Sequence, residues 1–88
     1  SQRAAEPCAM VIFGANGDLT KRKLIPALYA LYLDGFLPRE FCVVGISRTK
    51  LSHEEFRSGM RDAMQQFAPE LPLDPSKWER FASMLYYS

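Results

Sequence analysis

The sequence is poor in cysteine, has almost no net charge and contains no long apolar run. Its two cysteines, Cys8 and Cys42, are far apart and lack the spacing of a disulfide framework or a metal site. With no signal-peptide pattern, we expect a reducing compartment and a cytoplasmic location, and leave open organelle import after removal of a presequence. No run approaches the length of about 18 apolar residues that a membrane-spanning helix needs. A net charge of +1 gives no reason to propose nucleic acid or a membrane as a partner.

The composition is that of a small globular protein. The chain has 88 residues, of which 48% are hydrophobic and 24% are charged, and it has no repeats or low-complexity segments. These values exclude a disordered or fibrous class. A chain of this size buries only about 60–65% of its unfolded surface, so we expect one folded unit with a small margin of stability.

The most informative segment is a glycine loop that follows a short apolar run. Residues 9–13 lead directly into Gly14 and Gly17, and then into Asp18 and the consecutive cations of residues 21–23. Gly14 permits a tight turn, and Gly17 lets the backbone approach a pyrophosphate closely. The N–H groups of the following helical turn would point at the anion, and the cations would attract it. The pattern predicts a dinucleotide or nucleotide cradle, and its alternative is a tight turn without a ligand.

The loop departs from two common phosphate-binding motifs. No Gly-Lys-Ser/Thr follows at the distance of a Walker A loop, which disfavours phosphoryl transfer. In the Gly-x-Gly-x-x-Gly fingerprint, a glycine or alanine would stand at the position of Thr20, and the middle glycine is displaced here to Gly17.

The rest of the sequence predicts alternating strands and helices. The continuously apolar residues 9–13 predict a strand buried on both faces, and residues 41–46 predict a second buried strand, with Cys42 in the core. Residues 19–34 have helical spacing with an interruption at Pro26, and Gly35 ends that helix.

Two further helices and a strand complete the predicted order. Ser52 and Glu55 form a capping-box pattern, and Asp74 precedes a proline that opens the last helix. The apolar faces of these helices are predicted to pack in the core; their residues are Phe56, Met60, Ala63, Met64 and Phe67, then Trp78, Phe81 and Ala82. Residues 85–87 predict a third strand. The order predicts an α/β fold, the first half of a doubly wound parallel sheet with the first strand placed centrally.

The loop and the helix after it resemble a known family. The segment 14–29, GANGDLTKRKLIPALY, is similar to the opening of glucose-6-phosphate dehydrogenase, with its Gly-x-x-Gly-Asp-Leu-Ala/Thr-Lys-Arg/Lys-Lys motif, a proline and an aromatic-rich helix. Residues 34–38 and 44–49 fall where the family has a helix stop and a second strand that ends in arginine. The resemblance runs from about Met10 to Ser88 and is dense between Val11 and Arg48.

The resemblance implies a partial Rossmann-like domain that binds NADP and belongs to an oxidoreductase of glucose 6-phosphate. It implies the first portion of the NADP-binding domain at residues 9–88 and a homo-oligomer for the full-length protein, while the small and polar start of the chain predicts a flexible arm at residues 1–8. Residues 14–21 would wrap the pyrophosphate, Arg48 would meet the 2′-phosphate, and Lys23 would lie near the join of nicotinamide and sugar. The implied cofactor-binding set is Gly14, Ala15, Asn16, Gly17, Asp18, Leu19, Thr20, Lys21, Lys23, Ser47 and Arg48.

The same resemblance implies that catalytic residues are missing from these 88 residues. Neither the histidine–aspartate general base of the family nor its sugar-phosphate ligands match any position, and His53 is interpreted as a surface residue without a role. Lys23 is the one possible substrate or nicotinamide contact, and solvent exposure is its equal alternative. We therefore expect the isolated chain to bind NADP without turnover of glucose 6-phosphate to 6-phosphogluconolactone.

The end of the second strand favours NADP over NAD. An NAD site usually has an acid there for the ribose 2′-hydroxyl, whereas this strand continues into Ser47, Arg48, Thr49 and Lys50. The Arg48 guanidinium can grip a 2′-phosphate with its planar fork. The alternative is that Arg48 and Lys50 are ordinary solvated cations, and Asp18 is predicted to be a structural carboxylate.

Two functions of other classes stay open on the sequence. A module that senses NADP without chemistry would share all of these features. A helix-rich interaction domain would instead use the methionine and phenylalanine face of the helix after Ser52, and would not bind a nucleotide.

Overall fold

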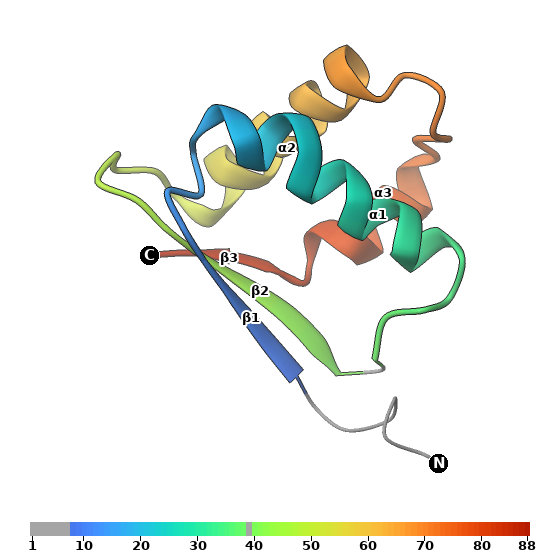
Figure 1. Cartoon of the computed structure of the whole chain (residues 1–88), viewed down its shortest axis with the longest axis horizontal. Helices are drawn as coiled ribbons and strands as arrows, with labels where there is room; N and C mark the ends of the chain where they lie inside the picture. The colour runs from blue at the N-terminus through green and yellow to red at the C-terminus, as the bar shows by residue number, and fades with distance from the viewer. Residues whose placement is uncertain (1–7, 39) are drawn as a thin grey trace.

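The fold is a parallel sheet covered by helices (Figure 1). A computed structural model describes residues 8–38 and 40–88. The elements are β1 (Cys8–Phe13), the π-helical turn η2 (Thr20–Leu24), α1 (Ile25–Leu33), β2 (Phe41–Ile46), α2 (His53–Phe67), α3 (Pro75–Ala82) and β3 (Leu85–Tyr87). The three strands are parallel in the order β1-β2-β3. The predicted order of elements and the α/β class are confirmed. Cys8 is the first residue of β1 and not part of an arm, and the rest of the predicted arm lies outside the described residues.

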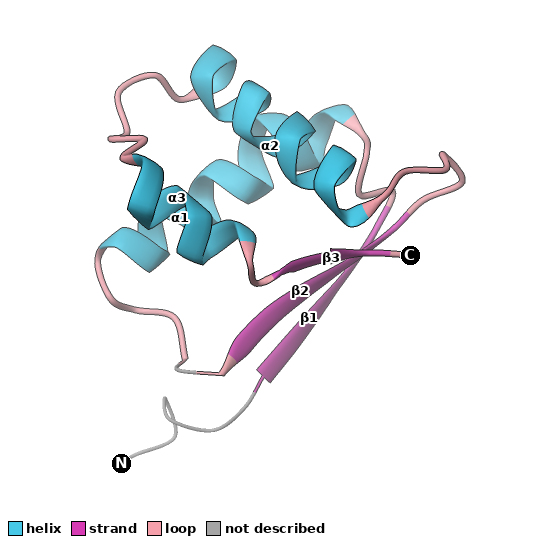
Figure 2. Cartoon of the chain, turned by 180° about the vertical axis from the view of Figure 1, so that it is seen from behind, coloured by secondary structure: helices cyan, strands magenta, loops and turns pink. Residues whose placement is uncertain are grey.

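All of the helices lie on one side of this sheet, as both views show (Figures 1 and 2). The prediction that the first strand is buried on both faces is therefore wrong for this chain. Ile12 is buried, but Val11 is 51% exposed and Phe13 is 79% exposed, because no layer of the described residues covers their face. The prediction of a central first strand is also wrong within this sheet, since β1 lies at its edge. Cys42 is half-buried on β2 and not a core residue.

The helices pack through an aromatic cluster. Tyr29 of α1 is fully buried, and its ring centroid lies 5.4 Å from that of Trp78 and 5.2 Å from that of Phe81, both on α3. The Tyr29 hydroxyl donates a 2.8 Å hydrogen bond to the carbonyl of Pro72. The predicted inward face of α3 is confirmed, and these contacts fix α3 against α1.

The apolar face of α2 lies in the core. Phe56, Met60 and Met64 are at most 1% exposed and Ala63 is 5% exposed, while Phe67 is half-buried. The predicted packing role is confirmed for Phe56, Met60, Ala63 and Met64, but not for Phe67, which lies outside the core cluster. Because a buried face is not available to a partner, the hypothesis of an interaction domain that uses this face is wrong.

The helix ends follow the predicted signals. Pro26 lies in the first turn of α1, and the N–H of Ile25 before it bonds the carbonyl of Thr20, five residues back. The predicted interruption thus takes the form of one wide turn, and Gly35 ends α1 with a positive φ of 77°. The capping box of α2 is confirmed, with both of its hydrogen bonds present. None of the helices in the described part of the chain is long and apolar enough to cross a membrane.

Candidate functional site

The glycine loop is bound to the carboxyl end of β2. The N–H groups of Gly14 and Ala15 both donate to the carbonyl of Ile46, at 2.8 and 3.1 Å. Gly14 has a φ of +69°, which is costly for any residue with a Cβ. The N–H of Gly17 donates to the carbonyl of Gly14 at 2.8 Å, and a Cβ on Gly17 would lie 3.0 Å from that oxygen. The two glycines therefore close a tight turn, which confirms the prediction for Gly14, whereas Gly17 was expected to allow the close approach of a pyrophosphate.

The backbone donors that remain free come from other residues of the loop. Asp18 and Leu19 have helical backbone directly before η2. Within residues 8–38 and 40–88, the N–H groups of Asn16, Asp18 and Leu19 donate to no backbone acceptor. The first N–H groups of a helix have no intrahelical partner and can bind an anion. The predicted wrapping set thus divides: Gly14, Ala15 and Gly17 shape the loop, and Asn16, Asp18 and Leu19 offer donors. The side chain of Leu19 is 73% exposed beside them.

Ala15 packs against a glycine that the sequence analysis missed. Ala15 is fully buried, and a Cβ built on Gly45 would lie 2.6 Å from its Cβ and 3.0 Å from the ring of Phe56. Gly45 therefore lets the loop and α2 approach β2 at the same point. Its position inside a strand was the available signal, because a strand glycine often marks a close backbone approach.

Thr20 belongs to the support of the loop. It is 4% exposed, and its hydroxyl is 3.4 Å from the carbonyl of Gly14, to which it donates. Thr20 stands at the third glycine position of the fingerprint. Its side chain hydrogen-bonds the loop, whereas a glycine there would only allow close packing.

The cations after the loop differ in their surroundings. Arg22 forms a 2.7 Å salt bridge with Asp18, and its guanidinium lies 4.6 Å from the centroid of the Phe67 ring. Both partners of the pair are exposed, so its contribution to stability is small. The structural role predicted for Asp18 agrees with this pairing. Lys21 is half-buried and Lys23 is exposed, so Lys23 stays available to a ligand.

The residues after β2 lie next to the loop, because Ile46 holds the loop and Ser47 follows it. The Ser47 hydroxyl accepts a 3.3 Å hydrogen bond from the N–H of Thr49. Arg48 is exposed and forms no salt bridge with a residue of 8–38 or 40–88. The structure brings Arg48 to the end of the sheet that carries the free donors, as predicted.

Side chains of α2 and β3 support this end of the sheet. The Tyr87 hydroxyl donates to the carbonyl of Thr49, and the Tyr87 N–H donates to Nδ1 of His53 at 2.9 Å. One turn further along α2, the Nε of Arg57 donates to the carbonyl of Leu85 at 2.8 Å. His53 is exposed as predicted, and its ring accepts a hydrogen bond from the backbone of β3, a structural contact that the sequence did not indicate.

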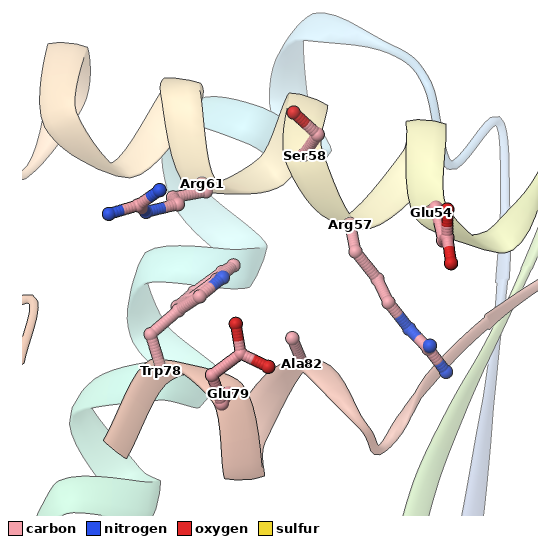
Figure 3. A pocket seen from close by; sticks show the side chains of 7 residues that line it. All are labelled: Glu54, Arg57, Ser58, Arg61, Trp78, Glu79 and Ala82. Atoms are coloured by element: carbon pink, nitrogen blue, oxygen red, sulfur yellow. The ribbon is translucent and has the colours of Figure 1, made fainter. Parts of the chain in front are cut away.

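A separate cavity of about 360 Å³ lies between α2 and α3 (Figure 3). Its charged lining is balanced: Arg57 and Arg61 oppose Glu54 and Glu79. Figure 3 shows Arg61 beside Trp78, and Arg57 extending toward β3. No predicted site residue lines this cavity, and its balanced charge favours neither an anion nor a cation. Among the described residues no group of three or more side chains could hold a metal ion.

Comparison with known proteins shows the family of the chain. Residues 11–88 match the sequence model of a family described as the NAD-binding domain of glucose-6-phosphate dehydrogenase. The chain belongs to this family. The resemblance recognised in residues 14–29 is thereby confirmed.

Relatives within the glucose-6-phosphate dehydrogenase family are similar over nearly the whole chain. The glucose-6-phosphate 1-dehydrogenase of Chlamydia muridarum (strain MoPn / Nigg) is 49% identical over 84 residues, which are 96% of this chain and 17% of that protein. That of Gluconobacter oxydans (strain 621H) is 46% identical over 82 residues, 93% of this chain and 17% of that protein. The chain therefore spans about a sixth of the length of these curated relatives.

Solved structures of the family have the same fold. A glucose-6-phosphate dehydrogenase in complex with its substrate glucose-6-phosphate matches with a TM-score of 0.81 at 37% identity, over 94% of this chain and 17% of that one. The glucose-6-phosphate 1-dehydrogenase of Mycobacterium avium matches with the same TM-score at 26% identity, over 93% of this chain and 17% of that one.

Proposed function

We propose that this chain is the NADP-binding segment of a glucose-6-phosphate dehydrogenase, which oxidises glucose 6-phosphate to 6-phosphogluconolactone. The observation that carries the proposal is the glycine loop, with free N–H groups at Asn16, Asp18 and Leu19 next to exposed Arg48. The tight glycine turn fits a pyrophosphate site, because a Cβ at Gly17 would crowd the Gly14 carbonyl and one at Gly14 would strain the backbone, so both positions favour glycine and keep the loop compact.

Each part of the site has one task in this proposal. The free N–H groups bind the pyrophosphate, with Lys21 adding positive charge. Arg48 grips the 2′-phosphate with two parallel donors, and Ser47 supplies a hydroxyl beside it. Lys23, which is exposed, contacts the substrate or the nicotinamide end of the cofactor. NADP, when bound, supplies the chemistry by accepting a hydride from C1 of the sugar.

The chain's own contribution is to bind and orient, and we propose that these residues alone do not turn over substrate. Removal of the proton from the C1 hydroxyl needs a general base. No histidine–aspartate pair occurs among the described residues: His53 is held by the backbone of Tyr87. The homo-oligomer and the cytoplasmic location predicted from the sequence remain part of this proposal.

A binding experiment tests the cofactor assignment. The dissociation constants of NADP and NAD are measured for the full-length protein, for Arg48→Ala and for Lys50→Ala, an exposed cation of the same loop. Losing charge-assisted hydrogen bonds worth about 1.5–3 kcal/mol should weaken NADP binding about 10- to 150-fold in Arg48→Ala, with little change for NAD. Lys50→Ala should stay close to wild type. Equal NADP affinity in wild type and Arg48→Ala would sink the assignment.

An activity assay separates the enzyme from a module that only senses NADP. The full-length protein is incubated with NADP and glucose 6-phosphate, and absorbance of the reduced cofactor is followed. Reduction that depends on glucose 6-phosphate supports the dehydrogenase. Tight NADP binding without any reduction would favour the sensing module.

A further inference from the structure

The turn that carries Arg48 has little support of its own. Arg48, Thr49 and Lys50 are all exposed, and Ser47 is half-buried. Within the turn the Ser47 hydroxyl accepts from the N–H of Thr49, at a long 3.3 Å. A short exposed segment held by one weak local bond samples many conformations unless a distant element fixes it.

Tyr87 of β3 supplies that distant contact. Its hydroxyl donates a hydrogen bond to the carbonyl of Thr49, 38 residues earlier in the sequence and one residue after Arg48. This hydrogen bond connects the backbone of the turn to β3 at the residue that directly follows Arg48.

Tyr87 is itself firmly held. It is 8% exposed, its ring centroid lies 4.9 Å from that of Phe56, and its N–H donates to Nδ1 of His53 at 2.9 Å. In the sheet it is the register partner of Gly45, and the N–H of the next residue, Ser88, bonds the Gly45 carbonyl at 2.8 Å. Contacts from α2 and β2 therefore fix the phenol ring. The hydroxyl of this fixed ring then holds the Thr49 carbonyl, and with it the turn, in one position.

We propose that Tyr87 is a positioning residue for cofactor choice: by holding Thr49 it holds Arg48 where a 2′-phosphate is bound. This rests on the proposed function, in which Arg48 meets that phosphate. Fixing a flexible side chain before binding lowers the entropy cost of binding. Only a ligand with a 2′-phosphate benefits, because NAD presents no charge to Arg48. Tyr87 thus raises the affinity for NADP and leaves that for NAD unchanged.

The test compares Tyr87→Phe with wild type in the full-length protein. The dissociation constants of NADP and NAD are measured by titration, and their ratio is the readout. Losing one net hydrogen bond predicts a three- to tenfold smaller preference for NADP, with the NAD constant unchanged. Tyr86→Phe is the matched control, because the neighbouring Tyr86 hydroxyl makes no hydrogen bond within residues 8–38 and 40–88.

Two further measurements separate positioning from a general loss of structure. In an Arg48→Ala background, Tyr87→Phe should cause no additional change in the ratio, since its effect acts through Arg48. Amide hydrogen exchange without cofactor should be faster at Thr49 in Tyr87→Phe and unchanged at core residues of β2 such as Val43.

The outcomes distinguish this inference from the proposed function. If Arg48→Ala abolishes the preference for NADP but Tyr87→Phe keeps it, the inference is wrong and the proposed function stands. Equal weakening of NADP and NAD binding in Tyr87→Phe also overturns it, because the role would then be merely structural. If Arg48→Ala leaves the preference unchanged, the proposed cofactor site is wrong and the role of Tyr87 in cofactor choice is wrong with it.

Discussion

Replacing Gly45 by alanine should disturb both the fold and the glycine loop. The added Cβ would lie 2.6 Å from the Cβ of Ala15 and 3.0 Å from the Phe56 ring, whereas carbon atoms pack at about 3.5–4.0 Å. Both neighbours are fully buried, and Ala15 is bound to the Ile46 carbonyl, so the loop must move by about 1 Å. Overpacking of this kind costs about 1–3 kcal/mol.

Two close contacts at once place the cost of overpacking at about 3 kcal/mol. The better strand propensity of alanine offsets about 0.5–1 kcal/mol of this cost, so the expected net loss of stability is about 2 kcal/mol. For a chain of this size, 2 kcal/mol lowers the melting temperature by about 8–16 °C. Moving the loop also displaces the donors at Asn16 and Asp18. We therefore expect NADP affinity to fall about three- to tenfold, as for the loss of one hydrogen bond.

Urea unfolding and NADP titration of the same preparations measure both effects. Gly59→Ala is the matched control, since a Cβ on this glycine inside α2 meets nothing within 4 Å. It should raise stability by about 0.5–1 kcal/mol and leave binding unchanged. A Gly45→Ala protein as stable as wild type, with equal NADP affinity, would refute the argument from close approach.

Three further substitutions test how the helices are held. Ser52→Ala removes the side-chain acceptor that caps α2 and should cost about 1 kcal/mol in urea unfolding; an unchanged midpoint would contradict that role. The Ser76 hydroxyl donates to Asp74 and lowers the pKa of its carboxyl, so the stability from this cap is present above about pH 4 and is lost as pH falls through the lowered pKa. Unfolding of Asp74→Asn between pH 5 and 2 should thus depend less on pH than that of wild type, and parallel curves would disprove this. Tyr29→Phe loses the hydrogen bond to Pro72 and should cost about 1 kcal/mol at neutral pH. Burial raises the pKa of Tyr29, so wild type should lose stability as pH rises above about 10 and through the raised pKa, more steeply than the variant; equal slopes would refute this.

The fold was predictable where signals are local. Ser52 and Glu55 gave the start of α2, Gly35 gave the end of α1, and the apolar run before Gly14 gave β1 and the loop. Such signals depend on hydrogen bonds between residues a few positions apart, so the residue types and their spacing in the sequence are enough to predict them. The burial of β1 was not predictable in this way. A continuous apolar run shows that a strand suits two covered faces, but Val11 and Phe13 are exposed because only one face is covered here.

The place of the candidate site in the fold was predictable, and the hydrogen bonds that its residues make were not. The sequence located the loop and Arg48 correctly at one end of the sheet. It did not show that the N–H groups of Gly14 and Ala15 are occupied by the Ile46 carbonyl, so that the free donors lie at Asn16 and beyond. Which N–H groups are free depends on how closely the end of β2 approaches the loop after β1, and this becomes known only when the two strands are paired.

The sequence by itself determined the order of strands and helices, the caps, the glycine loop and the absence of an acid after β2. Each of these depends on residue type and on neighbours within about four positions. Tertiary structure alone decided that Ala15 packs against Gly45 and that the Tyr87 hydroxyl bonds the Thr49 carbonyl. These pairs are 30 and 38 residues apart in the sequence. Contacts across such separations exist only after the sheet has brought its strands together, and they are what hold the loop and Arg48 in place.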